Sequence, residues 1–528
     1  MTTGLLERSA SVDRTDARPE PRPRPFFPRW HWAALGLVTV LGAAVRVRGF
    51  TDAGLWRDDA WVALSSRVGI GTAWHMWATA PGFYFVERSW MVLHIGSTSW
   101  AQVVPFALGV AAMPAAFALA RVFGFGRRTS LCCTLVVAMS PVCLMYSTRL
   151  KEYGADFLLA CLLLGLGESA RRRATPRSFA LLGLVSVLSF GVSASTALVV
   201  VAVWIALTID VVGRRAAHPA SRRTFLSVGA VSALVCLVEE KVLYRHISPR
   251  LQQNWSGFYI SHNSLIGLVA SAHARVLVLC SGLVGTYDRS PLQAALLFTV
   301  VTVLLVAGMT VGRDMLAPTL VLVFALGAAL ADRIPIGTGR TDEVLYPALL
   351  LLGASGLRRI RFALGRHVPR LSVRRVAVAL IAVVVTGILL NDGLTLDTQY
   401  PATDVRTLAA EIHQAMRPGD HIVVRSLMRY PWALYEDEHL TIRFGTAWST
   451  GFTVANTEPG VFIIPSQRNE GDVNPSQWAS EVSGYHRLWF VGVGSLAQSP
   501  TFRILHRSGW HAVETLYAPG CQATLVVR

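Results

Sequence analysis

The sequence predicts a mostly α-helical protein that crosses a membrane about eleven times and ends in a small α/β domain. Hydrophobic residues make up 52% of the 528 residues and charged residues only 15%, which is more apolar than a soluble chain of this length requires. Apolar runs of membrane-spanning length recur from residue 30 onward. Arginines gather after every second apolar run, as they do in cytoplasmic loops.

Residues 1–29 are rich in arginine and proline, and we expect them to form a disordered cytoplasmic tail. The first apolar run then exits on the outer face without a visible cleavage site. The predicted spans are 30–45, 101–122, 130–145, 157–167, 179–190, 197–212, 225–243, 292–311, 316–331, 344–356 and 376–390. Every even-numbered span ends at arginines, which predicts a multi-pass protein of the plasma or inner membrane with a cytoplasmic N-terminus.

Two segments of this predicted transmembrane domain, residues 30–391, are not expected to span. Residues 46–100 form the first outer loop, and their many tryptophans favour helices that lie in the membrane interface. Residues 264–285 are apolar, but counting them as a span would put the later arginines outside. We therefore predict an outer-leaflet or re-entrant helix there.

Residues 392–528 contain no spanning run and alternate like a small α/β domain. Helices are predicted at 404–416 and 502–506, and strands at 421–424, 440–442, 461–464, 488–493 and 523–527. An odd number of spans and a cytoplasmic start place this domain outside the cytoplasm. It has no Gly-rich phosphate loop between a strand and a helix, so nucleotide binding is not expected.

The net charge of +17 would also suit a nucleic-acid-binding protein. The arginines lie between apolar runs rather than in one stripe with interleaved aromatic residues, so nucleic acid is not an expected partner. Membrane lipids are an expected partner.

Two adjacent aspartates, Asp58 and Asp59, follow the first span directly and should lie at the outer membrane surface. Neighbouring carboxylates repel each other, so they require a cation, a proton or a substrate as partner. The plainer alternative is an incidental acidic pair at the start of a solvated loop.

The surroundings of this pair resemble the GT-C superfamily of membrane glycosyltransferases. The resemblance lies in Leu55-Trp56-Arg57-Asp58-Asp59-Ala60, Pro81-Gly82-Phe83-Tyr84-Phe85, Ser140-Pro141 leading to Tyr146-Ser147, and Lys151-Glu152-Tyr153-Gly154-Ala155-Asp156. The pattern is most similar to the branch with the protein O-mannosyltransferases and lipid A aminoarabinose transferases (glycosyltransferase family 39-like), and it covers about residues 30–360. It implies a GT-C fold, a polyprenyl-phosphate-linked sugar donor and inversion at the anomeric carbon.

Sugar transfer from a lipid phosphate requires a base near the acceptor hydroxyl and positive charge at the leaving phosphate. Asp58 is the candidate general base, because a carboxylate accepts the hydroxyl proton as attack develops. Asp59 is the second catalytic candidate, either orienting Asp58 or holding Mg²⁺ or Mn²⁺ together with Asp156. The alternative role of Asp156 is a helix-start residue favoured by the helix dipole.

Four basic residues are candidates for the donor phosphate: Arg340, Lys151, Arg46 and Arg48. Arg340 ranks first because it follows a Gly-rich turn, which lets the backbone approach a ligand closely. The alternative for each arginine is an interfacial side chain that reaches lipid headgroups.

The sequence therefore predicts a membrane glycosyltransferase that moves a monosaccharide from a polyprenyl-phosphate donor to an envelope glycan, lipid or protein acceptor on the outer face. Two other classes stay open: a transporter or flippase of lipid-linked saccharides, and a non-catalytic envelope assembly protein. A transporter should show repeated halves and broken mid-membrane helices, and no such symmetry is visible.

Overall fold

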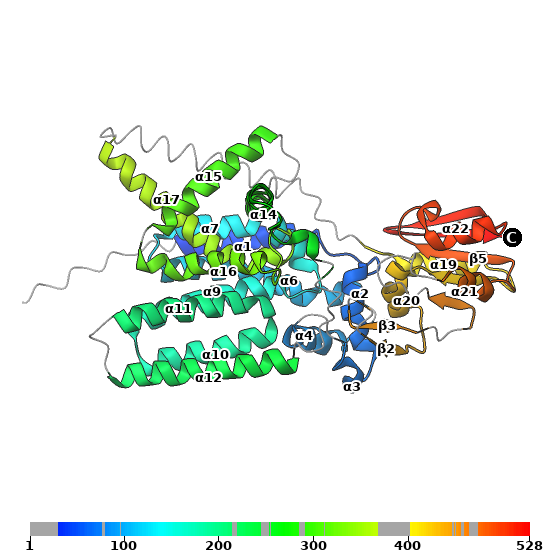
Figure 1. Cartoon of the computed structure of the whole chain (residues 1–528), viewed down its shortest axis with the longest axis horizontal. Helices are drawn as coiled ribbons and strands as arrows, with labels where there is room; N and C mark the ends of the chain where they lie inside the picture. The colour runs from blue at the N-terminus through cyan, green and yellow to red at the C-terminus, as the bar shows by residue number, and fades with distance from the viewer. Residues whose placement is uncertain are drawn as a thin grey trace, which may run out of the picture.

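The computed structural model describes residues 30–76, 80–95, 97–213, 219–243, 253, 255–284, 291–310, 312–367, 402–445, 448, 450–455, 459–463 and 474–528. The predicted tail, 1–29, and the last predicted span, 376–390, lie outside the described residues, as does the predicted boundary at 391 and 392. In Figure 1 the apolar helices fill one half of the molecule and a sheet lies at the opposite end, with α2, α3 and α4 between them.

Each predicted span that falls within the described residues coincides with a helix. The helices of this half are α1 (Trp30–Val47), α6 (Val103–Val122), α7 (Arg127–Met139), α8 (Pro141–Met145), α9 (Tyr153–Arg173), α10 (Pro176–Val192), α11 (Ala197–Gly213), α12 (Pro219–Leu243), α14 (Leu265–Val284), α15 (Pro291–Met309), α16 (Leu316–Leu330) and α17 (Tyr346–His367). The helical membrane class is thereby confirmed.

Within the described residues, 6 helices are long and apolar enough to cross a membrane, or up to 7 if the bent pair of α7 and α8 is one span. The predicted count of about eleven is larger because it accepted shorter and more charged segments and because it included 376–390, which lies outside the described residues. Helix α10, at 17 residues, is one of the shorter segments. Helix α12 carries charged residues at both ends.

The uncertain segment, 264–285, forms the continuous helix α14, which length and composition would allow to span. Figure 1 looks nearly along the axis of α14, whereas α9, α10, α11 and α12 run across the picture. Helix α14 thus crosses the long direction of these helices. The outer-leaflet or re-entrant placement of this helix stays a prediction.

Two glycines let α15 and α17 pack with their backbones in contact. A Cβ on Gly356 would lie 1.9 Å from the carbonyl oxygen of Leu304, and one on Gly308 would lie 2.1 Å from that of Leu352. A backbone oxygen cannot move aside as a flexible side chain does. The helix pair must therefore separate to admit any side chain at these positions.

Replacing Gly356 by alanine is expected to destabilise the protein by about 1–3 kcal/mol, the usual cost of overpacking. Gly353 on the same helix is the matched control, since a Cβ placed there would meet no other atom within 4 Å. Gly353→Ala should be neutral or slightly stabilising. Thermal unfolding of both variants in one detergent, followed by tryptophan fluorescence, makes the comparison. Equal melting temperatures for the two variants would contradict this packing.

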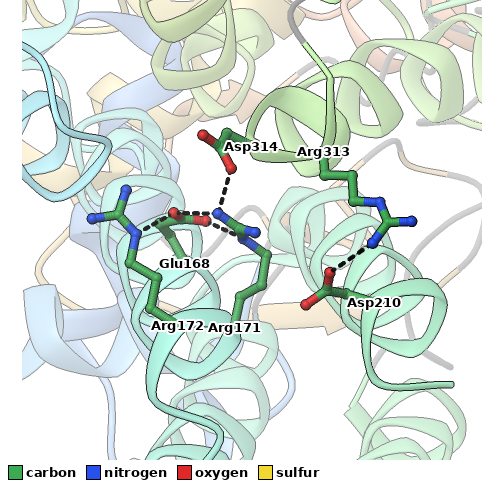
Figure 2. A network of polar contacts seen from close by, with 6 residues as sticks. All are labelled: Glu168, Arg171, Arg172, Asp210, Arg313 and Asp314. Atoms are coloured by element: carbon green, nitrogen blue, oxygen red, sulfur yellow. Dashed lines mark hydrogen bonds and ion pairs between the residues drawn. The ribbon is translucent and has the colours of Figure 1, made fainter. Parts of the chain in front are cut away.

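A charged network ties together three helix ends that the charge pattern assigns to the cytoplasmic side (Figure 2). Its members are Glu168, Arg171, Arg172, Asp210, Arg313 and Asp314. The buried carboxylate of Glu168 accepts hydrogen bonds from Arg171 at 2.7 and 2.8 Å, and Arg171 also reaches Asp314 at 2.5 Å. Because Glu168 and Arg171 belong to α9 and Asp314 to η6 (Arg313–Met315), the network connects α9 with the start of α16.

The first outer loop folds into short helices, as its aromatic content predicted. They are α2 (Arg57–Ala63), η1 (Leu64–Arg67), α3 (Ile70–Ala73), α4 (Pro81–Met91) and α5 (Thr98–Ala101). The later loops contain η2 (Tyr146–Thr148), η3 (Ala194–Thr196), η5 (Ser256–Phe258) and η7 (Thr341–Val344).

The C-terminal region is an α/β unit, as predicted. Its elements are α19 (Val405–Ala415), β1 (His421–Val424), η8 (Ser426–Met428), α20 (Arg429–Tyr435), β2 (Ile442–Phe444), β3 (Phe452–Val454), β4 (Val461–Ile463), α21 (Pro475–Glu481), β5 (Arg487–Gly492), η10 (Leu496–Gln498), α22 (Pro500–Arg507), β6 (His511–Ala518) and β7 (Cys521–Val527). The main sheet has the order β4-β1-β5-β7-β6. Strand β1 is parallel to β4 and β5, and β7 is antiparallel to β5 and β6. The sequence did not predict β6. Because β6 pairs with β7, β7 lies inside the sheet and not at its edge.

The first outer loop and the C-terminal unit share one hydrophobic core. Leu55 and Trp61 from the loop belong to the same buried cluster as Trp432 and Trp489. The backbone N–H of Leu55 also donates to the Tyr435 hydroxyl at 2.9 Å. The C-terminal unit therefore packs directly against α2, the helix that carries the two aspartates.

Candidate active site

The two adjacent aspartates point to different surroundings because they occupy the first turn of α2. Successive helical residues project about 100° apart, so neighbours in sequence do not share a face. The side chain of Asp58 is 29% exposed, whereas that of Asp59 is fully buried. The expected repulsion is relieved by a separate arginine for each carboxylate.

Asp58 pairs with Arg340, the first-ranked phosphate candidate. Arg340 Nη2 donates to Asp58 Oδ2 at 3.0 Å, across 282 residues of sequence. A second cation near this carboxylate is Arg57, whose Nε lies 3.7 Å from Asp58 Oδ1. The structure thus brings together a candidate base and a candidate phosphate ligand that the sequence placed in two distant loops.

Aromatic rings hold these arginines in place. The Arg340 guanidinium carbon lies 5.5 Å from the Trp56 ring centroid and 5.6 Å from that of Trp255. Arg149 lies over Trp56 at 4.3 Å. Cation–π contacts of this length stabilise a positive charge without neutralising it. Positive charge therefore gathers around the exposed aspartate.

Lys151 joins the same group from the loop before α9. Its Nζ lies 3.7 Å from the Trp61 ring centroid, and the side chain is buried. Burial lowers the pKa of the Lys151 ammonium to about 8, although Asp58 and Asp59 favour its charged form. The amine is therefore charged below about pH 8, the form that attracts a phosphate.

Asp59 forms a buried ion pair with Arg149 at 3.6 Å. Glu87 of α4 lies behind this pair, fully buried, and neither of its carboxyl oxygens has a hydrogen-bond partner in the described residues. Burial and then the charge of Asp59 raise the pKa of Glu87 well above its usual value. Burial thus favours the protonated form of Glu87.

The predicted phosphate ligand Arg46 is not part of this group. It is buried in α1, and its guanidinium donates to the carbonyl oxygens of Val137 and Ala138 at 2.9 and 3.0 Å. These carbonyls lie at the end of α7, where the helical ladder leaves acceptors unmatched. Arg46 thus fastens α1 to α7, and the sequence-based role at the phosphate is corrected. Arg48 is exposed on the turn after α1.

Asp156 occupies the first turn of α9 and is buried. Its Oδ2 accepts a hydrogen bond from Ser195 at 2.8 Å. In the described residues no hydrogen bond or ion pair joins Asp156 to Asp58 or Asp59. The described residues thus show no direct contact between Asp156 and the aspartate with which it was predicted to hold a metal ion.

No group of three or more His, Cys, Asp or Glu side chains in the described part of the chain could hold a metal ion. Asp58 and Asp59 each face a guanidinium, and Asp156 faces a serine hydroxyl. These surroundings do not fit a divalent cation, which requires several converging oxygens. The use of Mg²⁺ or Mn²⁺ stays a prediction that an assay must test.

Sequence reasoning missed Glu87, the pair Trp56 and Trp255, and Asp342. Glu87 lies mid-helix in an apolar segment, where an isolated acid is a visible signal. Asp342 follows the Gly-rich turn that drew attention to Arg340. Nothing in the sequence indicates that Trp255 approaches Arg340, because this contact depends on how the chain folds.

No protein-family model and no curated protein matches the chain. Among solved structures, ArnT from Cupriavidus metallidurans in the apo state matches with a TM-score of 0.56 and 14% identity, over 94% of this chain and 97% of that chain. The same protein bound to undecaprenyl phosphate matches with a TM-score of 0.53 and 13% identity over the same shares. Arabinofuranosyltransferase AftD from Mycobacteria gives a weaker match, with a TM-score of 0.46 and 15% identity over 94% of this chain and 41% of that chain.

The agreement with ArnT extends over almost the whole of both chains, including the C-terminal region. The chain therefore has a GT-C-like fold, and it is a multi-pass membrane protein. At 13–14% identity, residue roles do not transfer with the fold.

Proposed function

We propose that the chain is a membrane glycosyltransferase that moves a monosaccharide from a polyprenyl-phosphate-linked donor to an acceptor hydroxyl of the cell envelope. The observation that carries this proposal is the contact between Asp58 and Arg340, a partly exposed base next to a cation, with Lys151 beside them. The ArnT fold, which is known with undecaprenyl phosphate bound, supports a donor of this class.

In the proposed reaction the acceptor oxygen attacks the anomeric carbon, and the bond from that carbon to the phosphate oxygen breaks. Asp58 takes the hydroxyl proton, and polyprenyl phosphate leaves with the bonding electron pair. Attack from the side opposite the phosphate inverts the anomeric centre. The two carboxylates therefore differ in role, since only Asp58 is exposed enough to meet an acceptor.

Arg340 and Lys151 would hold the leaving phosphate. A guanidinium has five N–H donors, so Arg340 can bind a phosphate while it keeps its bond to Asp58. This double contact would set the distance between base and leaving group. Both side chains are largely shielded from water, which strengthens their attraction for an anion.

The two alternative classes receive less support. A transporter uses repeated halves around a mid-membrane site. The group described above instead lies between the helical half and the C-terminal unit, on α2 and the loops before α9 and α17 (Figure 1). A non-catalytic assembly protein would not require a base and cations to meet across such distant segments.

The decisive test is transfer itself. Purified protein in lipid nanodiscs is incubated with a panel of radiolabelled polyprenyl-phosphate sugars and envelope extract, with and without EDTA. We expect label to enter an acceptor from at least one donor. Transfer from none of the donors, with carrier lipid merely moved across the bilayer, would favour the transporter class.

Arg340→Ala should weaken binding of undecaprenyl phosphate roughly tenfold or more, as loss of one charge-assisted contact does. Arg333→Ala is the matched control, because Arg333 lies in the same loop but outside the group around Asp58. Carrier affinity is measured by quenching of tryptophan fluorescence, since Trp56 and Trp255 flank Arg340. Equal affinities for the two variants would remove Arg340 from the phosphate site.

A further inference from the structure

We propose that Asp342 is a positioning residue that shapes the loop 335–341 and thereby presents Arg340 to Asp58 and to the donor phosphate. This inference rests on the proposed function, because it concerns the same phosphate site. It assigns a role to a carboxylate that touches neither the proposed substrate nor the base.

Three consecutive backbone N–H groups converge on the Asp342 carboxylate. Gly337 N–H donates to Oδ1 at 3.0 Å, and Thr338 and Gly339 N–H donate to Oδ2, both at 2.9 Å. A concave row of N–H groups of this kind binds an anion. Here the anion is the chain's own carboxylate, which fixes the backbone just before Arg340.

The loop does not adopt this shape without support. Gly337 and Gly339 both have positive φ, +61° and +67°, a conformation that glycine reaches readily and other residues rarely. A Cβ on Gly337 would lie 2.3 Å from the carbonyl oxygen of Arg275, so the loop also packs closely against α14. The glycines permit the turn, and the Asp342 carboxylate selects it from the many shapes that glycines allow.

The path from Asp342 to the base is short. The Thr338 hydroxyl accepts a hydrogen bond from the backbone N–H of Arg340 at 2.9 Å, and Thr338 itself is held by Asp342. From this fixed backbone the Arg340 side chain reaches Asp58, and its guanidinium lies over the rings of Trp56 and Trp255. A shift of the loop would move the guanidinium away from all three of these groups.

The charged form of Asp342 is the one that accepts three N–H groups. Burial raises the pKa of Asp342 to about 6, although the bonds from Gly339, Gly337 and Thr338 act in the opposite direction. The carboxylate is therefore ionised above about pH 6 and becomes protonated as the pH falls below it. Protonation removes acceptor capacity and should loosen the loop on the acid side.

Several other ionisable groups lie near this carboxylate. They are Glu343 on the same turn, Arg340 in the loop, and, on the elements that pack against this turn and loop, Asp156 and Tyr153 of α9, Tyr346 of α17 and Arg275 of α14. None of them forms a hydrogen bond or ion pair with Asp342 in the described residues, so its backbone bonds dominate its surroundings.

The first experiment measures hydrogen exchange of the segment 335–345 by mass spectrometry, on the full chain in nanodiscs without any ligand. In Asp342→Asn the N–H groups of this segment should exchange at least roughly tenfold faster, since an amide offers one acceptor oxygen and no charge. Protection in α16 and α17 should not change. Arg340→Ala should leave the segment protected, because Arg340 is the presented residue and not the support.

The second experiment measures the affinity for undecaprenyl phosphate between pH 5 and 8. Wild type should lose affinity steeply as the pH falls through about 6, whereas Asp342→Asn should be roughly tenfold weaker at pH 7 and should follow only the titration of the carrier phosphate itself, whose second pKa is also about 6. Asp342→Glu, which keeps a titrating carboxylate, should restore part of the pH dependence. Asp404→Asn is the control, because Asp404 also accepts a backbone N–H, at 3.2 Å, but caps α19.

Unchanged exchange in Asp342→Asn would overturn the inference, and so would faster exchange with wild-type affinity and pH profile. A wild type that binds no undecaprenyl phosphate would instead refute the proposed function. The exchange experiment, which requires no ligand, would then still decide whether Asp342 orders the loop.

Discussion

Replacing Asp58 by asparagine is expected to reduce the initial rate of sugar transfer by roughly 10²–10⁴-fold, the usual loss when a general base is removed. Asparagine keeps the size and the hydrogen-bonding shape but cannot take the acceptor proton. Because Arg340 can still donate to the amide oxygen, affinity for the carrier should change little. The measurement is a single-turnover rate with the donor identified in the panel, next to carrier affinity.

The matched control is Asp52→Asn, since Asp52 lies on the same outer segment and is exposed. That variant should transfer at the wild-type rate. A folded Asp58→Asn protein that turns over normally would refute the proposed mechanism. A rate loss accompanied by an equal loss of carrier affinity would assign Asp58 to holding Arg340 rather than to proton transfer.

Periodicity and charge pattern were sufficient to predict the class of this fold. Apolar runs locate helices because a membrane accepts no unsatisfied backbone, so length and hydropathy alone mark them. The strand at 421–424 was predicted at the residues where β1 forms, because a short run of β-branched apolar residues after a turn favours a strand. Strand β6 was missed because its residues are mostly exposed and carry no strong alternation.

The site was only partly predictable, for a physical reason. Asp58, Arg340 and Lys151 were chosen from local chemistry, and the structure brings them together. Arg46 was chosen on the same grounds and proved to bind backbone carbonyls instead. An arginine that follows a span can face lipid, a ligand or another part of the protein. The sequence does not indicate which helix end lies next to that arginine in the fold.

The shared core indicates what the C-terminal unit contributes to the proposed site. Helix α2 has seven residues, too few to be stable alone. Trp432 of α20 belongs to the same buried cluster as Trp61 of α2, and the Tyr435 hydroxyl accepts the N–H of Leu55 just before α2. Arg67 of η1, which follows α2 directly, donates to the carbonyl oxygens of Ala433 and Leu434. The C-terminal unit thus fixes the helix on which Asp58 must be held still.

The buried pair of Asp59 and Arg149 should dominate the stability of this region. Asp59→Asn leaves the Arg149 charge buried without its carboxylate, and removal of one partner of a buried pair typically costs about 3–5 kcal/mol. The side chains are 0% and 6% exposed, so water cannot replace the lost partner. The apparent melting temperature in detergent should fall by several degrees, whereas Asp58→Asn, at a more exposed carboxylate, should melt close to wild type.

Glu87 makes this prediction sharper. The charge of Asp59 favours the protonated form of Glu87, so Asp59→Asn removes that influence and lets Glu87 ionise more readily in place of the lost carboxylate. The double variant with Asp59→Asn and Glu87→Gln should therefore lose more stability than the two single variants lose in sum. Asp59→Asn with Arg149→Met should recover part of the loss, because no unpaired charge remains buried. Strictly additive melting shifts across both double mutants would show that these three side chains do not share one electrostatic site.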